Sequence, residues 1–336
     1  MVMNKESLMF RKLFCIFECS RIFSLPMSIL SWLIVFMYSI SDSGNIFYGI
    51  LTLIGICFAH LGTNLIDDLI DYKYLMKSVD FDKKTYLQNS QKTKCRYLVS
   101  GALTEKQVIF IISIYFSIST IIGLFLYLKC GIGVIYFAVI GGIIGLLYPF
   151  LSRICLSEFA VGLTYGPVLF GGVYYSMTES YSNEVFILSI PSMIMTIVLL
   201  YIHTVMDYDF DTNEGKKTIS NRFNSQLESL IILKWLLIFA YSTVVLLCIF
   251  DIADWQVFLT FLTIPLAVDL YQSLKLFSEN PETVPEKRWY HFPMENWKRL
   301  EERQETSFMM RMYQSRNLMI YFSTFLTLGI VLSLLI

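Results

Sequence analysis

The sequence predicts an all-α polytopic membrane protein, and three observations support this prediction. The 336 residues are 55% hydrophobic and only 16% charged, with a mean hydropathy of +0.59, which is typical of membrane bundles rather than soluble domains. The apolar residues form runs of about 20, the length that a helix needs to cross a bilayer. Lysine and arginine are concentrated in alternate segments between those runs. No linker divides the chain, so residues 1–336 are expected to form a single transmembrane domain.

Nine apolar runs are long enough to be membrane-spanning helices. In chain order they cover residues 22–41, 46–66, 107–128, 130–151, 157–176, 184–206, 228–250, 255–275 and 315–336. Residues 1–21 precede them as an amphipathic lead-in without the cleavage site of a signal peptide. The fourth and fifth runs are rich in glycine, which favours close helix packing in lipid.

The first of two acidic segments, residues 60–71, reads HLGTNLIDDLID and ends the second apolar run. Carboxylates at such a depth are costly to bury and usually have a function. On a helix, Asn64, Asp68 and Asp71 are spaced four and three apart and therefore share one face, whereas Asp67 points further round. Taken alone, this segment is also compatible with a helix that simply emerges into water.

The second acidic segment, residues 203–211, reads HTVMDYDFD and ends the sixth apolar run. Aligned, both segments read His, three residues, Asn or Asp, three residues, Asp, which indicates pseudo-repeated halves of one bundle. Two such sets facing each other suit Mg²⁺, which prefers a few carboxylates plus substrate phosphates. The expected metal ligands are Asn64, Asp67, Asp68, Asp71, Asp207 and Asp211, and the expected catalytic residues are Asp68, Asp71, Asp207 and Asp211.

The basic residues predict the orientation. With the N-terminus inside, 24 of the 26 lysines and arginines fall on inner segments, as the positive-inside rule requires. We therefore expect a multi-pass protein of the cell membrane whose N-terminus and both acidic segments are cytoplasmic. Residues 72–106 and 275–316 form long inner segments, and His291 in the second of them is expected to be exposed. The roles of His60 and His203 stay open between carboxylate partner and buried histidine.

The ionisation of an allylic diphosphate is one reaction that would need both acidic segments. Mg²⁺ would neutralise the charge on the leaving diphosphate as a Lewis acid, and cations would clamp the remaining oxygens. Arg96, Lys216 and Lys217 are the candidate cations, although each also fits the positive-inside rule. The allylic carbocation needs a dry aromatic surrounding. Tyr148 is a candidate for this role, and packing is the alternative for it. Asn64 is also expected among the substrate-binding residues.

With these motifs in view, the chain resembles the UbiA superfamily of intramembrane prenyltransferases. That family pairs an Asn/Asp-rich motif after its second helix with a DxxxD motif after its sixth, here NLIDDLID and DYDFD. The chain is most similar to the MenA branch, 1,4-dihydroxy-2-naphthoate prenyltransferase. The supporting stretches are RIFSLP at residues 21–26, GTNLIDDLIDY at 62–72, LVSG at 98–101 and SEFAVGLTYGP at 157–167.

The sequence departs from that branch before the second motif. MenA-like enzymes usually read NNxRD there, and this chain has His203, Thr204 and Met206 in place of the two asparagines and the arginine. Asp67 also stands where asparagine is usual. These departures bear on the acceptor more than on the prenyl diphosphate chemistry, because Asp207 and Asp211 are present.

The resemblance implies a Mg²⁺-dependent transferase that moves an isoprenoid chain from a prenyl diphosphate to an aromatic acceptor, in menaquinone biosynthesis if the acceptor is dihydroxynaphthoate. A different acceptor or a terpene cyclisation is the alternative within the enzymes. A transporter is the alternative outside them, although the acids lie at helix ends rather than mid-span. The expected partners are donor, acceptor and lipid bilayer, with no nucleic acid. The seven scattered cysteines form no CxxC pair, so disulfides and zinc are not expected.

Overall fold

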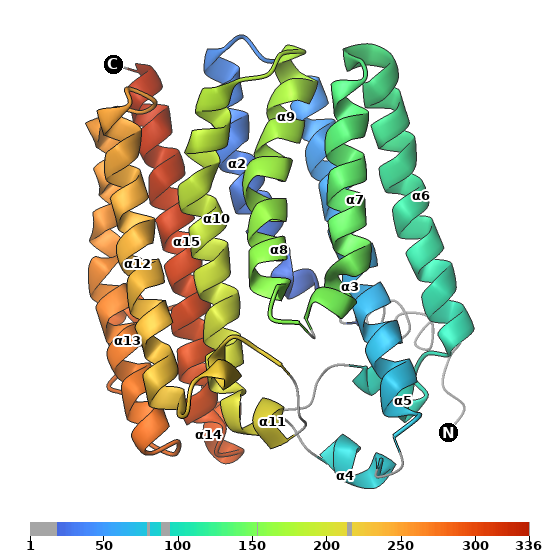
Figure 1. Cartoon of the computed structure of the whole chain (residues 1–336), viewed down its shortest axis with the longest axis vertical. Helices are drawn as coiled ribbons and strands as arrows, with labels where there is room; N and C mark the ends of the chain where they lie inside the picture. The colour runs from blue at the N-terminus through green and yellow to red at the C-terminus, as the bar shows by residue number, and fades with distance from the viewer. Residues whose placement is uncertain (1–18, 79–80, 89–94, 153, 214–216, 336) are drawn as a thin grey trace.

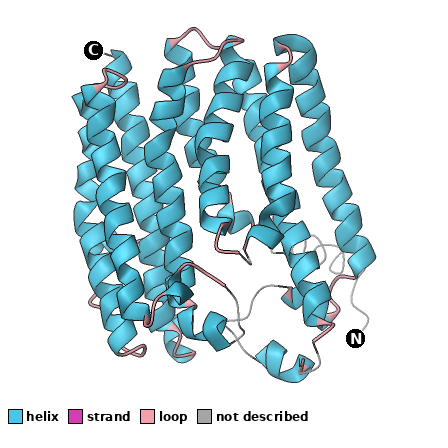
Figure 2. Ribbon diagram, in the orientation of Figure 1, coloured by secondary structure: helices cyan, strands magenta, loops and turns pink. Residues whose placement is uncertain are grey.

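The computed structural model describes residues 19–78, 81–88, 95–152, 154–213 and 217–335. Every regular element within these ranges is a helix (Figure 2). The long helices run side by side in one bundle, and short helices gather at one of its ends (Figure 1). The prediction of an all-α bundle is therefore confirmed.

Eight helical stretches are long and apolar enough to cross a membrane. They are α2 (Pro26–Ser41) with its leading turn η1 (Ile22–Ser24), α3 (Ile46–Leu75), α6 (Glu105–Cys130), α7 (Gly133–Leu151), α10 (Asn183–Met206), α12 (Gln226–Ile249), η4 (Trp255–Thr263) joined to α13 (Ile264–Glu279), and α15 (Thr306–Leu335). The short helices are α4 (Lys83–Gln88), α5 (Arg96–Ser100), α11 (Tyr208–Asn213), η3 (Ser220–Arg222), η5 (Trp289–His291) and α14 (Trp297–Glu302).

The fifth predicted span is also helical, but it is broken. It consists of α8 (Ser157–Leu163), the π-helical turn η2 (Thr164–Val168) and α9 (Leu169–Thr178). Pro167 cannot donate a backbone hydrogen bond, and Gly166 has a non-helical conformation with φ −97° and ψ −110°. A Cβ on Gly166 would lie 2.7 Å from the Cβ of Met193 in α10. The break and the close contact with α10 therefore depend on the same Gly-Pro pair, and together with the eight unbroken stretches this segment approximates the nine predicted spans.

Close packing holds the bundle together, as expected where lipid replaces water around the helices. The largest core cluster joins α2, α9, α10, α12, α13 and α15, and a smaller one joins α3, α5 and α6. The backbones of α15 and η4 approach each other closely at Gly329, where a Cβ would lie 2.6 Å from the Cα of Val257 in η4.

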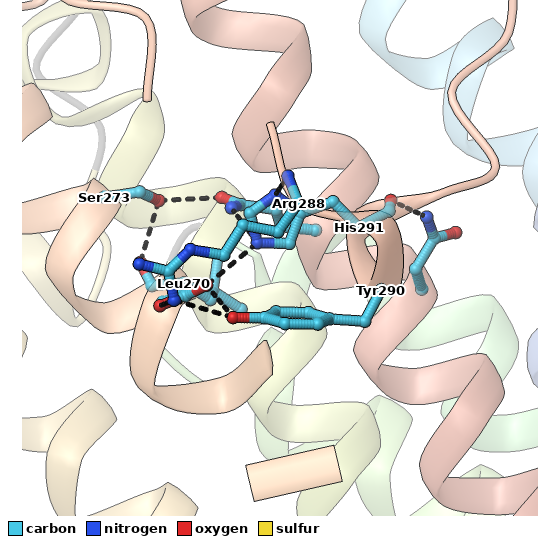
Figure 3. Close-up of polar contacts among 8 residues, drawn as sticks. Leu270, Ser273, Arg288, Tyr290 and His291 are labelled. Atoms are coloured by element: carbon cyan, nitrogen blue, oxygen red, sulfur yellow. Dashed lines mark hydrogen bonds and ion pairs between the residues drawn. The ribbon is translucent and has the colours of Figure 1, made fainter. Parts of the chain in front are cut away.

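The polar segment between α13 and α15 folds back onto these two helices. Arg288, Tyr290 and His291 converge on α13 (Figure 3), where Asp269 accepts hydrogen bonds from Arg288 Nη1 at 3.0 Å and Tyr290 Oη at 2.6 Å. His291 Nε2 lies 3.1 Å from the same carboxylate, and His291 Nδ1 accepts from the Arg288 backbone N–H. The Nε2 atom therefore carries the proton of a neutral imidazole.

The prediction that His291 is exposed is wrong, since only 1% of this residue is accessible. Its partner Asp269 lies 22 positions earlier in the chain, so no local pattern reveals the contact. On α15, Asn317 donates to the carbonyls of His291 and Pro293 at 2.7 and 3.0 Å. The fully buried Arg311 donates to the carbonyls of Ser273, Thr283 and Ser307. These bonds anchor the segment to the bundle.

Candidate active site

Both acidic segments lie at the end of the bundle where α3 and α10 finish, which we call the acidic end (Figure 1). The helix α3 continues without a break to Leu75, nine residues beyond the predicted apolar run, so the first acidic segment lies inside a helix. The helix α10 instead stops at Met206, and Asp207 caps it with φ −92° and ψ 11° before α11 begins. The repeated sequence pattern is thus not repeated as local structure.

The carboxylates of the first acidic segment are buried beside an arginine. Asp67 and Asp68 are 3% and 2% exposed. Arg21 Nη2 forms an ion pair and hydrogen bond with Asp68 Oδ1, and lies 3.7 Å from Asp67 Oδ2. Burial alone would lower the pKa of the Arg21 guanidinium, but the attraction of Asp68 and Asp67 outweighs it and the pKa is raised above its usual value.

The turn that carries Arg21 is built against the same face of α3. Asn64 Nδ2 donates to the Ser20 carbonyl at 3.3 Å and to Ser24 Oγ at 3.1 Å. The two ring nitrogens of His60 lie 2.9 Å from Ser24 Oγ and 2.6 Å from Ser28 Oγ. His60 therefore fixes the start of α2 on α3. This gives a structural role to one of the two histidines whose role the sequence left open.

The second acidic segment crosses the break between α10 and α11. The backbone N–H of Asp211 donates to the Asp207 carbonyl at 2.8 Å, and Asp211 is 6% exposed. Gln226 Nε2 and Ser220 Oγ donate to the carbonyls of Val205 and Thr204 at 2.7 and 2.9 Å. These bonds give side-chain partners to carbonyls in the last turn of α10, and they hold the following segment against α10.

The donor set fits a hard divalent cation chemically, because it consists of carboxylate and amide oxygens. The first segment already lies against a positive charge, that of Arg21. Across residues 19–78, 81–88, 95–152, 154–213 and 217–335, however, no three His, Cys, Asp or Glu side chains come together as an ion-binding group. A metal shared by both segments therefore stays a prediction, and Asp71, which is half-buried on α3, stays a predicted ligand.

The predicted substrate-binding residues lie in different surroundings. Arg96 Nη2 donates to the Leu87 carbonyl at 2.6 Å. Lys217 is exposed, and its carbonyl accepts a hydrogen bond from Cys155 Sγ at 3.2 Å. Tyr148 is half-buried in the last turn of α7. Lys216 lies outside the described residues.

Three residues of interest escaped the search for charged motifs. Arg21 entered only as part of the RIFSLP stretch, because its partners are far away in the chain. Within the described ranges, only Tyr97 Oη and Glu158 Oε1 are buried side-chain polar atoms without a hydrogen-bond partner. Burial, and next the charge of Asp68, raise the pKa of Tyr97. Glu158 is 2% exposed at the start of α8. The sequence signal that could have revealed it is a single acid between Ser157 and an apolar run.

The fold and the buried carboxylates define the class of this protein. It is a helical membrane bundle with an acidic site at one end. The sequence matches the UbiA prenyltransferase family over residues 25–297. The chain therefore belongs to the UbiA prenyltransferase family, and it is a multi-pass membrane prenyltransferase of the UbiA type.

One relative is similar in sequence over part of its length. The 2-carboxy-1,4-naphthoquinone phytyltransferase of Synechocystis sp. (strain ATCC 27184 / PCC 6803 / Kazusa) is 28% identical over 138 residues. This match covers 40% of the chain and less than half, 44%, of that relative.

The structural similarity extends over the whole bundle. A digeranylgeranylglyceryl phosphate synthase superposes with a TM-score of 0.60 at 16% identity, covering 96% of this chain and 99% of that one. A UbiA homologue from Archaeoglobus fulgidus bound to GPP and Mg²⁺ superposes with a TM-score of 0.56 at 13% identity, covering 90% and 99%. At such identities the superpositions establish the fold.

Proposed function

We propose that the chain transfers an isoprenoid from a prenyl diphosphate to an aromatic acceptor in a Mg²⁺-dependent reaction, with 1,4-dihydroxy-2-naphthoate as the first acceptor to test. The observation that carries the proposal is the pair of buried carboxylates, Asp67 and Asp68, held beside a cation at the acidic end. Such a pair is costly unless a positive charge compensates it. The GPP and Mg²⁺ bound to the Archaeoglobus homologue and the name of the Synechocystis relative support the choice of donor, metal and acceptor.

The acidic residues would hold the metal and thereby position the donor. Asn64, Asp67, Asp68 and Asp71 would act from α3, and Asp207 and Asp211 from the break after α10. When bound, Mg²⁺ supplies Lewis-acid stabilisation of the diphosphate charge.

The remaining residues would bind and orient the substrates. Arg96, Lys216 and Lys217 would donate charge-assisted hydrogen bonds to diphosphate oxygens. The allylic C–O bond breaks, and its electron pair leaves with the diphosphate. Tyr148 would present its ring to the resulting cation. The ring carbon of the acceptor that carries the leaving group forms the new C–C bond. For dihydroxynaphthoate this is the carbon that carries the carboxylate, which leaves as CO₂, and the electron pair of the broken C–C bond restores the aromatic ring.

The proposed orientation puts the acidic end in the cytoplasm, where soluble aromatic precursors and prenyl diphosphates are available. It is supported by the 24 of 26 basic residues on segments that would face inward.

Transfer of radiolabelled prenyl diphosphates by purified protein tests the proposal. Donors of several chain lengths are each offered with dihydroxynaphthoate, with other quinone precursors and without acceptor, in Mg²⁺ or in EDTA. We expect labelled product only with Mg²⁺, and its loss in Asp68→Asn and Asp211→Asn. Asp209→Asn is the matched control, because Asp209 is an exposed acid in the same motif that is not a proposed ligand.

The outcomes separate the possible functions. Product with a different precursor would replace the acceptor and keep the reaction class, and a cyclised product without acceptor would indicate a cyclase. Undiminished transfer by the Asp68 and Asp211 variants would refute the proposed site.

A further inference from the structure

The turn formed by residues 20–24 is bonded to the first acidic segment. Arg21 has a left-handed backbone with φ 56°, a conformation that non-glycine residues rarely adopt. Ser24 Oγ donates to the Arg21 carbonyl at 2.8 Å and so closes the turn. Asn64 binds Ser20 and Ser24 of the same turn. The guanidinium is thereby directed at Asp68, and its side chain is only 22% exposed.

This arrangement engages residues that the proposed function assigns to the metal. The Asn64 side chain donates to the turn, and an oxygen of Asp68 binds Arg21. A divalent ion must approach carboxylate oxygens to about 2.0–2.1 Å. At that distance from Asp68 it would lie beside the guanidinium, and two cations so close in a poorly solvated site repel each other strongly.

We propose that Arg21 is the internal counter-ion of Asp67 and Asp68 in the metal-free protein, and that a divalent metal must displace the Arg21 guanidinium from Asp68 to bind. Arg21 is thus a positioning residue that keeps two buried carboxylates in place until the metal arrives. The inference rests on the proposed function for the presence of a metal at Asp68. The ion pair itself does not depend on that function.

Two opposite effects follow for Arg21→Gln. Without metal, Asp67 and Asp68 lose their compensating charge, so the protein becomes less stable. With metal, the ion no longer competes with a guanidinium, so it binds more tightly. A purely structural role for Arg21 would weaken both the fold and metal binding.

Binding of Mn²⁺ without substrate, followed by electron paramagnetic resonance of the free ion, measures the competition. We expect the Kd of Arg21→Gln to be about tenfold or more below that of the wild type, as expected when a competing charge is removed from a site of low effective dielectric. Arg21→Lys, which keeps the charge but not the planar fork, should lie between them. Lys106→Gln is the matched control, because Lys106 is an exposed cation at the same end of the bundle and should leave the Kd unchanged.

Thermal unfolding in EDTA tests the counter-ion independently of any metal. Arg21→Gln should lower the Tm, and Arg21→Gln combined with Asp68→Asn should lower it by less than the sum of the two single changes. Additive losses would overturn the ion pair as a stabilising contact.

The outcomes distinguish this inference from the proposed function. Equal or weaker Mn²⁺ binding by Arg21→Gln, in a wild type that binds Mn²⁺, would overturn the competition and leave the prenyltransferase site standing. Absence of Mn²⁺ binding in every variant would overturn the competition together with the metal site.

Discussion

Asp269 is expected to be the residue that fixes the 280–305 segment to the bundle. Its side chain is 11% exposed, and it accepts hydrogen bonds from Tyr290 at 2.6 Å and His291 at 3.1 Å. A hydrogen bond to a charged group contributes about 1.5–3 kcal/mol. Asp269→Ala removes two of them and leaves the buried His291 N–H without an acceptor, so it should cost about 3–5 kcal/mol, the usual range for a buried pair that loses one partner. The contact with Arg288 contributes little, because the Arg288 side chain is 49% exposed and water screens its charge.

The loss should appear in thermal unfolding and in proteolysis. At about 2 °C per kcal/mol for a chain of this size, Asp269→Ala should lower the Tm by about 6–10 °C. Asp269→Asn keeps one acceptor oxygen and should lower it by about half as much. Trypsin should cut the variant faster at Lys287 and Arg288, because the segment opens more often.

The control is Glu282→Ala, which removes an exposed acid from the same segment and should change neither measurement. A Tm and cleavage rate of Asp269→Ala equal to those of Glu282→Ala would refute the idea that these hydrogen bonds hold the segment.

Three further predictions concern packing, pH and orientation. Gly329→Ala should destabilise the protein by about 1–3 kcal/mol, because its Cβ would meet the backbone of η4. Gly142→Ala, with open space around it, should not lower the unfolding temperature, because alanine favours a helix interior more than glycine does. Equal losses in the two variants would contradict the packing of α15. Burial lowers the pKa of His291 below its usual 6.5. As the pH falls, the unfolded chain therefore protonates this imidazole before the folded protein does, so the stability should fall as the pH drops below about 6.5. The fall should be smaller in His291→Gln, and identical pH profiles of the two proteins would contradict the prediction. In intact cells, an impermeant maleimide should label Ser43→Cys but not Glu302→Cys, and the reverse result would invert the proposed orientation.

Much of the fold follows from patterns that the sequence displays directly. Each spanning helix is a long apolar run, so length and hydropathy located them to within a few residues at most ends. The larger deviations lie where tertiary contacts extend a helix. The helix α3 continues to Leu75 because the turn around Arg21 covers its acidic face, and α15 begins at Thr306 because the buried Arg311 finds carbonyl partners on α13 and the segment after it. The break at Gly166 was visible only as a Gly-Pro pair.

The sequence predicted which residue types form the candidate site, but not how their side chains are arranged. The His-x₃-Asn/Asp-x₃-Asp pattern identified two acidic segments, and both lie at the acidic end. It did not reveal that Arg21 faces Asp68, 47 positions away, or that Tyr97 and Glu158 are buried with an unpartnered oxygen. Such contacts arise from the packing of distant elements, for which a single sequence carries no periodic signal. The roles assigned to the six residues of the acidic segments, to Tyr148 and to the three candidate cations remain predictions.

The central claim is that both acidic segments hold one prenyl diphosphate through Mg²⁺. Its most direct test is the Kd of a prenyl S-thiolodiphosphate, which does not ionise, measured by calorimetry with Mg²⁺ and with EDTA. We predict that EDTA weakens binding to the wild type by about 100-fold or more, in line with the loss of several charge-assisted contacts. Asp68→Asn and Asp211→Asn, on opposite segments, should each abolish most of that Mg²⁺ dependence. Equal binding in Mg²⁺ and EDTA, or full Mg²⁺ dependence in either variant, would contradict the claim.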